Sequence, residues 1–426
     1  MNDNNKYAMP FALVSLLFML WGIANNMNDT LLAAFKRIMS MSDLQTSLVQ
    51  FAFYGAYFCI ALPAALFIRR YSYKSGILLG LAVYALGTML FYPAGIAASY
   101  PFFLVAIYIM ACGCAILETT ANPYILAMGP RETATRRLNI AQTLNPLGAI
   151  AGILLSRMFI LSELQDADAA ARAGMDETAL RAMQQHELSA ISGTYMLIGC
   201  VLIALMVVML LVKMPALKES GQTSDCPTNK PAGTSVLSRL WRTRRYRYGV
   251  IAQFFYVGVQ TGVWSFTIRL VMAEAGCREA AAANIFLYSI LAFTTFRFIF
   301  TALMKRFDPA RLMTGAAMAA IVFTIIVICG HGAIAIAALV SISACMSLMF
   351  PTIYGIALDT VSPSDAKLGA SGLIMAILGG ALITPVQAYV SDQTDSISSS
   401  FIVPLICFTI ILIYAIGVSK NNAKRS

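Results

Sequence analysis

The chain has 426 residues, of which 59% are hydrophobic and only 12% are charged. Soluble domains are about half apolar and about a quarter charged, so this composition excludes an ordinary soluble protein and indicates a membrane protein. The formal net charge of +10 does not by itself indicate nucleic-acid binding, because its meaning depends on where the basic residues lie.

Apolar runs of about 20 residues recur along the whole chain, and each is long enough to cross roughly 30 Å of hydrocarbon as a helix. We expect twelve such helices, at approximately 9–35, 47–68, 75–95, 101–127, 138–161, 193–213, 249–272, 282–304, 312–330, 332–357, 368–390 and 400–419. Membrane β-strands would instead appear as alternating segments of about ten residues. Lys6 is the only basic residue before the first run, and no small-residue cleavage site follows, so we expect no cleaved signal peptide.

The basic residues gather on one side of the predicted membrane. If the N-terminus is cytoplasmic, the inner segments hold 22 of the 30 lysines and arginines, and the outer segments hold six. Cytoplasmic loops of membrane proteins carry this excess, so we expect both termini in the cytoplasm. The positive charge then reflects membrane topology, and we expect no nucleic-acid partner.

Residues 213–247 interrupt the apolar runs with a polar stretch that is rich in Pro, Gly and Ser and ends in a basic cluster. This composition is typical of a flexible linker. We predict an N-terminal six-helix half at 1–212, a cytoplasmic linker at 213–247 and a C-terminal six-helix half at 248–426. The expected fold class is an all-α membrane protein of twelve helices in two halves, which resembles the major facilitator fold.

Two carboxylates fall inside predicted spans, Asp29 in the first and Glu118 in the fourth. A charge at the bilayer centre costs roughly 2.5–3.5 kcal/mol on insertion scales, so each should face the bundle interior or a water-filled cavity. Desolvation favours the neutral carboxyl group, which suits reversible proton binding. The alternative is a structural role, in which either acid pairs with Arg269 or Arg297 to fix helix packing.

Polar side chains share helix faces with these acids. Asn26 lies three residues before Asp29 and Asn122 lies four residues after Glu118, spacings that put each pair on one face. Polar faces on later spans carry Gln142, Asn145, Tyr256, Gln260, Trp264 and Asn284. Amides pair with hydroxyl groups and aromatic rings stack on sugars, so these faces predict a cavity for a neutral, polyhydroxylated molecule. Single amides of this kind can also serve only to hold helices together.

Several classes of function lack their usual motifs. The nine cysteines include no Cys-x-x-Cys pair, so we expect neither a disulfide framework nor a metal site. The two histidines, His186 and His331, lie in predicted loops, away from any nucleophile inside the membrane. No Gly-x-x-x-x-Gly-Lys motif is present. We therefore expect no enzyme activity, no cofactor and no ATP-driven transport.

Five motifs carry a match to a known family: WGIANNMNDTLL, LETTANPY, RLNIAQTLNPLGAI, AQFFYVGVQTGVWSF and PTIYGIAL. They resemble the L-fucose:proton symporter family of the major facilitators, over nearly the whole chain. The resemblance implies that Asp29 is the site of protonation and coupling, and that Glu118 contributes to sugar binding and coupling. It also implies that Asn26, Gln142 and Asn145 line the same cavity.

The motif PTIY is preceded by a departure from this family. Met349 and Phe350 stand where L-fucose permeases carry a polar residue and a tyrosine hydroxyl, and relatives that take glucose, galactose or N-acetylglucosamine are similar to the form found here. Buried polar groups set sugar specificity strongly. Phe350 is therefore a candidate substrate contact, and the resemblance implies a sugar without fixing which one.

The leading hypothesis is a proton-coupled sugar importer of the inner membrane that works by alternating access, with L-fucose as the first candidate. The alternative is a glucose/galactose or N-acetylglucosamine transporter of the same family, coupled to protons or to sodium. A more distant alternative is a non-transporting sugar sensor. The expected partners are a sugar, protons and the lipid bilayer, and we expect a monomer.

Overall fold

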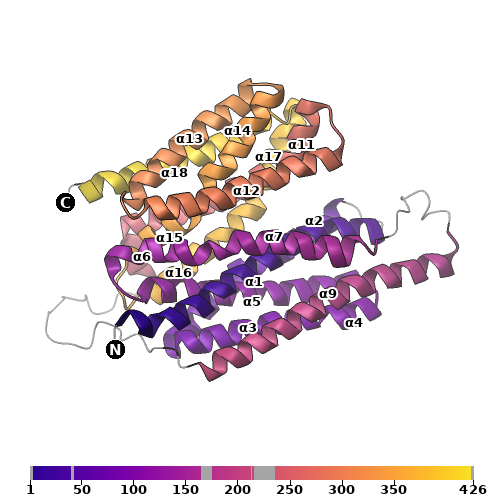
Figure 1. Cartoon of the computed structure of the whole chain (residues 1–426), viewed down its shortest axis with the longest axis horizontal. Coiled ribbons are helices and arrows are strands. Elements are labelled where there is room, and N and C mark those ends of the chain that lie inside the picture. Colours follow the sequence, from indigo (N-terminus) through magenta and orange to yellow (C-terminus); the bar gives the residue numbers. More distant parts are fainter. Residues whose placement is uncertain (1–2, 40–42, 165–174, 213, 215–235, 424–426) are drawn as a thin grey trace. The chain divides into compact units, whose positions relative to one another are not determined.

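The computed structural model describes residues 3–39, 43–164, 175–212, 214 and 236–423, and every regular element in these ranges is a helix (Figure 1). The chain divides into two compact units. Unit 1 is Met1–Ala121 with Leu147–Ala216, and unit 2 is Asn122–Pro146 with Leu217–Ser426. The two six-helix halves at 1–212 and 248–426 remain a prediction, because most of the linker predicted between them lies outside the described residues.

Unit 1 is built on long helices packed through small residues. A Cβ added at Gly87 would lie 2.3 Å from the backbone nitrogen of Met110, and one added at Gly113 would lie 2.3 Å from that of Tyr84. Glycines of this kind let two helix backbones approach closely. The elements are α1 (Asp3–Ile38), α2 (Asp43–Arg70), α3 (Tyr73–Met89), α4 (Phe91–Ile96), most of α5 (Tyr100–Ala127), most of α7 (Leu144–Ser156), the π-helical turn η2 (Arg157–Leu161) and α9 (Glu177–Leu211).

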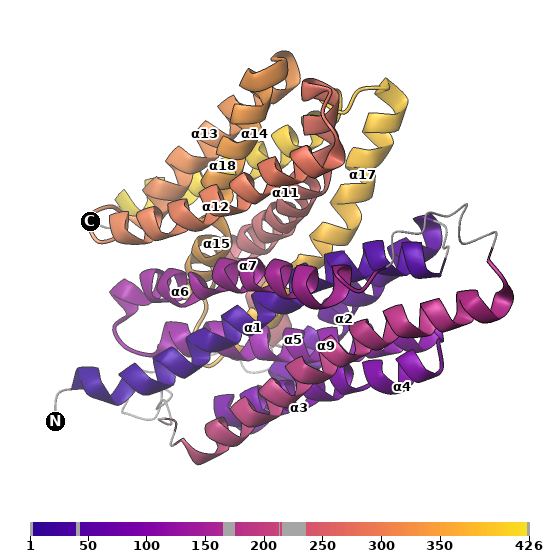
Figure 2. The same cartoon turned by 45° about the vertical axis from the view of Figure 1, so that its right-hand side comes forward.

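Unit 2 contains the rest of the described chain. Its elements are η1 (Arg131–Thr133), α6 (Ala134–Gln142), α10 (Val236–Arg242), α11 (Arg244–Ala275), α12 (Glu279–Leu303), α13 (Pro309–Cys329), α14 (Gly332–Met346), α15 (Met349–Asp359), α16 (Ala366–Met375), η3 (Ala376–Leu378), α17 (Gly379–Thr394), η4 (Ser399–Phe401) and α18 (Ile402–Ala423). Helix α13 packs against α14 and α18, and the three lie side by side in Figures 1 and 2. Helices α11 and α17 meet where Gly379 lies against the Phe254 carbonyl and Gly258 against Ile383.

Eleven stretches of the described chain are long and apolar enough to cross a membrane. The seventh predicted span, 249–272, is helical as the main part of α11 but is not among the eleven. Its two glutamines, Gln253 and Gln260, lower its hydropathy. A long helix of this polarity is stable in hydrocarbon only when its polar face is turned to protein or to an internal cavity.

Four predicted spans are interrupted helices rather than single ones. The breaks fall between α3 and α4, between α6 and α7, between α14 and α15, and between α16 and α17. Proline accounts for the first three, because Pro93, Pro146 and Pro351 each lack the N–H that a continuous helix needs. Two glycines, Gly379 and Gly380, open the segment after the fourth break.

The sequence of the polar segment at 162–192 predicts a short surface helix or two outside the membrane, and this prediction is wrong for its second part. Residues from Glu177 onward belong to α9, which continues without a break to Leu211. The polar pattern of residues 177–192 therefore belongs to one end of a helix that is long and apolar enough to cross a membrane.

The close approach of α3 and α5 generates a test of stability. Gly87→Ala would place a methyl group against the α5 backbone, and such overpacking costs about 1–3 kcal/mol. Gly55→Ala is the matched control, because nothing lies within 4 Å of its added Cβ. Thermal unfolding in detergent should show a lower midpoint for Gly87→Ala only. Equal midpoints for the two variants would contradict this packing.

Candidate functional site

Glu118 is buried in unit 1, with only 3% of its surface exposed. It lies on α5 and interacts electrostatically with Cys114, one turn earlier, and with Tyr57 on α2. The Tyr57 hydroxyl accepts a hydrogen bond from the indole nitrogen of Trp21 on α1. A carboxyl group in this position is shielded from bulk water and surrounded by groups that can hold or pass a proton.

The first predicted span places its polar run on α1. Asn26 is half-buried, its Nδ2 atom donates to the Gly22 carbonyl at 3.0 Å, and its Cβ lies near Gly152 of α7. Asp29 lies on the same helix three residues later, but its side chain is outside the described residues. The coupling role of Asp29 therefore stays a prediction.

Two candidate sugar ligands contact each other in unit 2. The Gln142 side chain on α6 donates from Nε2 to Oδ1 of Asn122 at 2.8 Å, and both residues are buried. The Nδ2 atom of Asn122 is also buried and has no hydrogen-bond partner among the described residues. Because an unpaired buried donor is costly, this amide is suited to receive a polar ligand. Asn145, at the start of α7, is half-buried.

The predicted polar face of α11 reaches α14. The Tyr256 hydroxyl donates to the Met346 carbonyl at 3.0 Å, and the Trp264 indole donates to Oγ of Ser343 at 3.3 Å. The Trp264 ring also packs edge-on against Phe293 of α12, with 5.2 Å between ring centres. Gln260, on the same helix, is half-buried.

The remaining two candidates differ in burial. Phe350 on α15 is buried, and its ring centre lies 6.1 Å from that of Tyr256 and 6.4 Å from that of Tyr354. Asn284 on α12 is exposed. The structure thus brings Phe350 and Tyr256 together, as it does Asn122 and Gln142. Among the described side chains, no candidate forms a hydrogen bond or ring contact with Asn284.

Sequence reasoning missed several buried polar residues and left two arginines without a role. Trp21 and Tyr57 gave no signal, because aromatic residues are common in spans. Arg297 is only 3% exposed and donates to two backbone carbonyls, whereas Arg269 is exposed and lies over the Phe266 ring. The sequence singled out Arg297 as a cation within a predicted span but left its role open.

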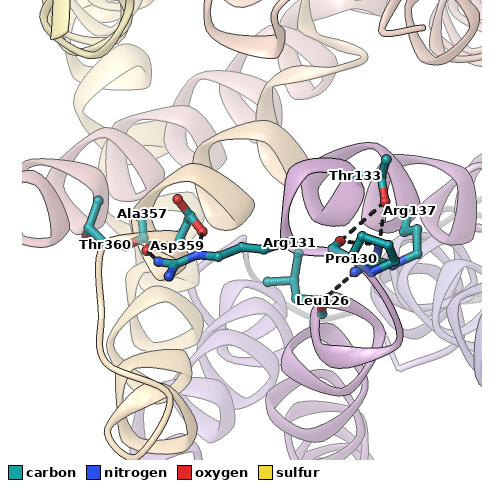
Figure 3. Close-up of polar contacts among 8 residues, drawn as sticks. All are labelled: Leu126, Pro130, Arg131, Thr133, Arg137, Ala357, Asp359 and Thr360. Atoms are coloured by element: carbon teal, nitrogen blue, oxygen red, sulfur yellow. Dashed lines mark hydrogen bonds and ion pairs between the residues drawn. The ribbon is translucent and has the colours of Figure 1, made fainter. Parts of the chain in front are cut away.

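Within unit 2, an ion pair joins the loop before α6 to α15 (Figure 3). Nε of Arg131 lies 2.5 Å from Oδ1 of Asp359, and the same guanidinium donates to the Asp359 carbonyl. Arg137 donates to the carbonyls of Leu126 and Pro130, at 2.7 and 2.6 Å. Farther along α6, Asn139 donates to Oγ1 of Thr352 at 3.3 Å. The contacts of Arg131 and Asn139 hold α6 and the loop before it, and with them Gln142, against α15.

Comparison with known proteins identifies the family. The sequence model of the Major Facilitator Superfamily matches residues 12–385. The chain is 43% identical to the L-fucose-proton symporter of Haemophilus influenzae, over 97% of each chain. It is 37% identical to the L-fucose-proton symporter of Escherichia coli, over 97% of this chain and 94% of that one. The glucose/galactose transporter of Brucella abortus biovar 1 is 32% identical, over 99% and 96%.

Solved structures agree with the sequence comparison. The crystal structure of the major facilitator transporter FucP in the outward conformation has a TM-score of 0.87 at 37% identity, covering 97% of this chain and 99% of that one. The proton:xylose symporter XylE has a TM-score of 0.66 at 10% identity, covering 98% and 96%, and so shares the fold alone. These findings confirm the predicted fold class and a multi-pass membrane protein. The chain belongs to the Major Facilitator Superfamily and, within it, to the family that contains the L-fucose-proton symporters.

Proposed function

We propose that this protein is a sugar:proton symporter that carries L-fucose into the cell by alternating access. The relatives that share 43% and 37% of its residues are named L-fucose-proton symporters. The structural observation that carries the proposal is the buried Glu118 carboxyl group beside Tyr57. A carrier of this kind makes and breaks no covalent bond, so we propose no enzymatic activity and no cofactor.

In the proposed cycle the outward-facing carrier binds a proton at Asp29 and then a sugar. Neutralising the carboxylate allows the carrier to close without moving a bare charge through a dry interior. Inward opening releases both, and the empty carrier returns. A proton moving inward gains about 2.3 kcal/mol per 100 mV of membrane potential, and each factor of ten in sugar concentration requires about 1.4 kcal/mol. One proton per sugar therefore supports accumulation by tens of fold.

The sugar is proposed to bind through the amides and aromatic rings of the candidate site. Asn122 has an unused buried donor, and Gln142 is its partner. Further contributions are proposed from Asn26, Glu118, Asn145, Tyr256, Gln260, Trp264, Asn284 and Phe350. We also propose that the carrier is a monomer of the inner membrane with both termini in the cytoplasm.

Glucose or galactose is the second candidate substrate, and one observation favours it. Phe350 is buried among aromatic rings and offers no hydroxyl, and a glucose/galactose transporter is 32% identical to the chain. External pH in a weakly buffered, de-energised cell suspension distinguishes the candidates, after pulses of L-fucose, D-galactose, D-glucose and N-acetylglucosamine. Transient alkalinisation identifies a symported sugar. Uptake of labelled sugar without any pH change would overturn proton coupling.

Asp29→Asn should abolish accumulation of sugar against a gradient, because the amide binds no proton at this position. Labelled-sugar uptake into energised cells should then reach a ratio of about one between inside and outside, instead of tens of fold. Exchange of labelled for unlabelled sugar at equal concentrations is the control and should persist. Accumulation at the wild-type level would contradict the assignment.

Glu118→Gln should weaken sugar binding or its pH dependence between pH 5 and 9, since the carboxyl group is replaced by an amide of equal size that binds no proton. The matched control is Glu187→Gln, which alters a second buried acid of unit 1, on α9, that is not a candidate site residue. Sugar affinity measured across this pH range should change in the first variant only. A pH profile that is identical in Glu118→Gln and the wild type would refute this role.

Phe350→Tyr should shift the preference among sugars, because the added hydroxyl can pair with a sugar hydroxyl that the phenylalanine leaves unpaired. Competition of unlabelled sugars against the transported one gives the specificity profile. An unchanged ranking of the four sugars would place residue 350 outside the substrate site.

A further inference from the structure

Two of the interrupted helices break in the same way. Helix α6 ends at Gln142 and α7 begins at Leu144, while α14 ends at Met346, with Ser347 as its cap, and α15 begins at Met349. In a continuous helix, each carbonyl accepts a hydrogen bond from the N–H four residues later. The residues four positions after Gln142 and Ser347 are Pro146 and Pro351, which have no N–H. Both carbonyls therefore lose their helical donor.

Arg297 donates to these same two carbonyls. Its side chain extends from α12, with Nη1 at 3.0 Å from the Gln142 oxygen and Nε at 2.6 Å from the Ser347 oxygen. The guanidinium lies over the Phe293 ring, 4.8 Å from its centre, and is buried. One side chain thus replaces the two donors that two prolines remove.

The chemistry of the contact fits this arrangement. The last carbonyls of a helix carry partial negative charge, and a cation at a helix C-terminus is stabilising. No water is present in a hydrocarbon interior to satisfy a bare carbonyl. A guanidinium offers several donors in a fixed planar fork, so it can serve two carbonyls in different directions, which an ammonium group does with less directional control.

Each break carries a candidate substrate contact. Gln142, whose carbonyl Arg297 binds, uses its side chain to contact Asn122. Phe350 lies between Ser347 and Pro351, and its ring packs beside Tyr256, whose hydroxyl donates to the neighbouring Met346 carbonyl. A shift of either break would therefore move a side chain of the candidate sugar site.

We propose that Arg297 is a positioning residue of the sugar site: it replaces the donors missing at Pro146 and Pro351, and so fixes both helix breaks and the candidate sugar contacts that they carry. This inference rests on the proposed function for its sugar readout. The carbonyl contacts themselves can be tested without any sugar.

The test is a cycle of four proteins: the wild type, Arg297→Lys, Pro146→Ala/Pro351→Ala, and all three substitutions together. In the native background, Arg297→Lys should raise the Kd for the transported sugar about tenfold or more, equivalent to roughly 1.4 kcal/mol. In the double-alanine background the same change should raise Kd by less than about threefold, because restored N–H groups serve both carbonyls. The matched control is Arg269→Lys, which alters an arginine that also lies over a phenylalanine ring and should leave Kd unchanged.

The midpoint of thermal unfolding of the same four proteins gives a readout that needs no sugar. Arg297→Lys should lower the midpoint more in the native background than in the double-alanine background. The inference would be overturned if Arg297→Lys raised Kd and lowered the unfolding midpoint by the same amounts in both backgrounds. A Kd for Arg297→Lys equal to that of the wild type would also overturn it. If the wild type binds none of the four sugars, the proposed function fails, while the midpoints still decide whether Arg297 serves the two carbonyls.

Discussion

The absence of water from the hydrocarbon interior is the constraint on which this structure depends, because every backbone N–H and C=O inside the membrane must find a partner within the protein. Continuous helices meet this requirement by themselves. Interrupted helices do not, and here they recruit side chains from elsewhere. Tyr256 serves one carbonyl at the end of α14, and Arg297 serves the next one.

The same constraint explains why polarity and close packing occur together. The α3 and α5 backbones approach through Gly87 and Gly113, which leaves little space for lipid or water between them. Glu118 lies on α5 a little more than one turn after Gly113 and is buried in the same unit. A carboxyl group is tolerated in such a place when the groups around it are held in position to interact with it. In such surroundings, gain or loss of a proton by the carboxyl group strongly changes these interactions.

Composition and run lengths were sufficient to predict the helical bundle and the positions of its spans. The two carboxylates inside spans could be found by counting, and the family by its motifs. The breaks were harder to predict, although Pro146 and Pro351 are visible in the sequence, because a proline shows which bond is lost and not what replaces it. The replacement donor is Arg297, 155 residues from Gln142. The pairing of Asn122 with Gln142 likewise depends on how α5 turns back into α6.

The α9 helix shows a different limit of sequence reasoning. Its N-terminal end is polar enough to resemble a separate surface helix, yet it is continuous with an apolar segment in one helix from Glu177 to Leu211. Hydropathy locates the boundary of the membrane, whereas hydrogen bonding locates the end of a helix. The two coincide only when a cap or a proline happens to lie at the membrane surface.

The arginines that contact α15 and the helix breaks differ in how strongly water and salt compete for their contacts. Arg131 and Asp359 have side chains that are 65% and 50% exposed, so water and salt compete for both, and such a pair contributes about 0–1 kcal/mol. Breaking this pair therefore costs little free energy. Arg297 is only 3% exposed, so little solvent can compete for its carbonyl partners. Raising the salt concentration therefore weakens the contact of Arg131 with Asp359 and leaves the contacts of Arg297 almost unchanged.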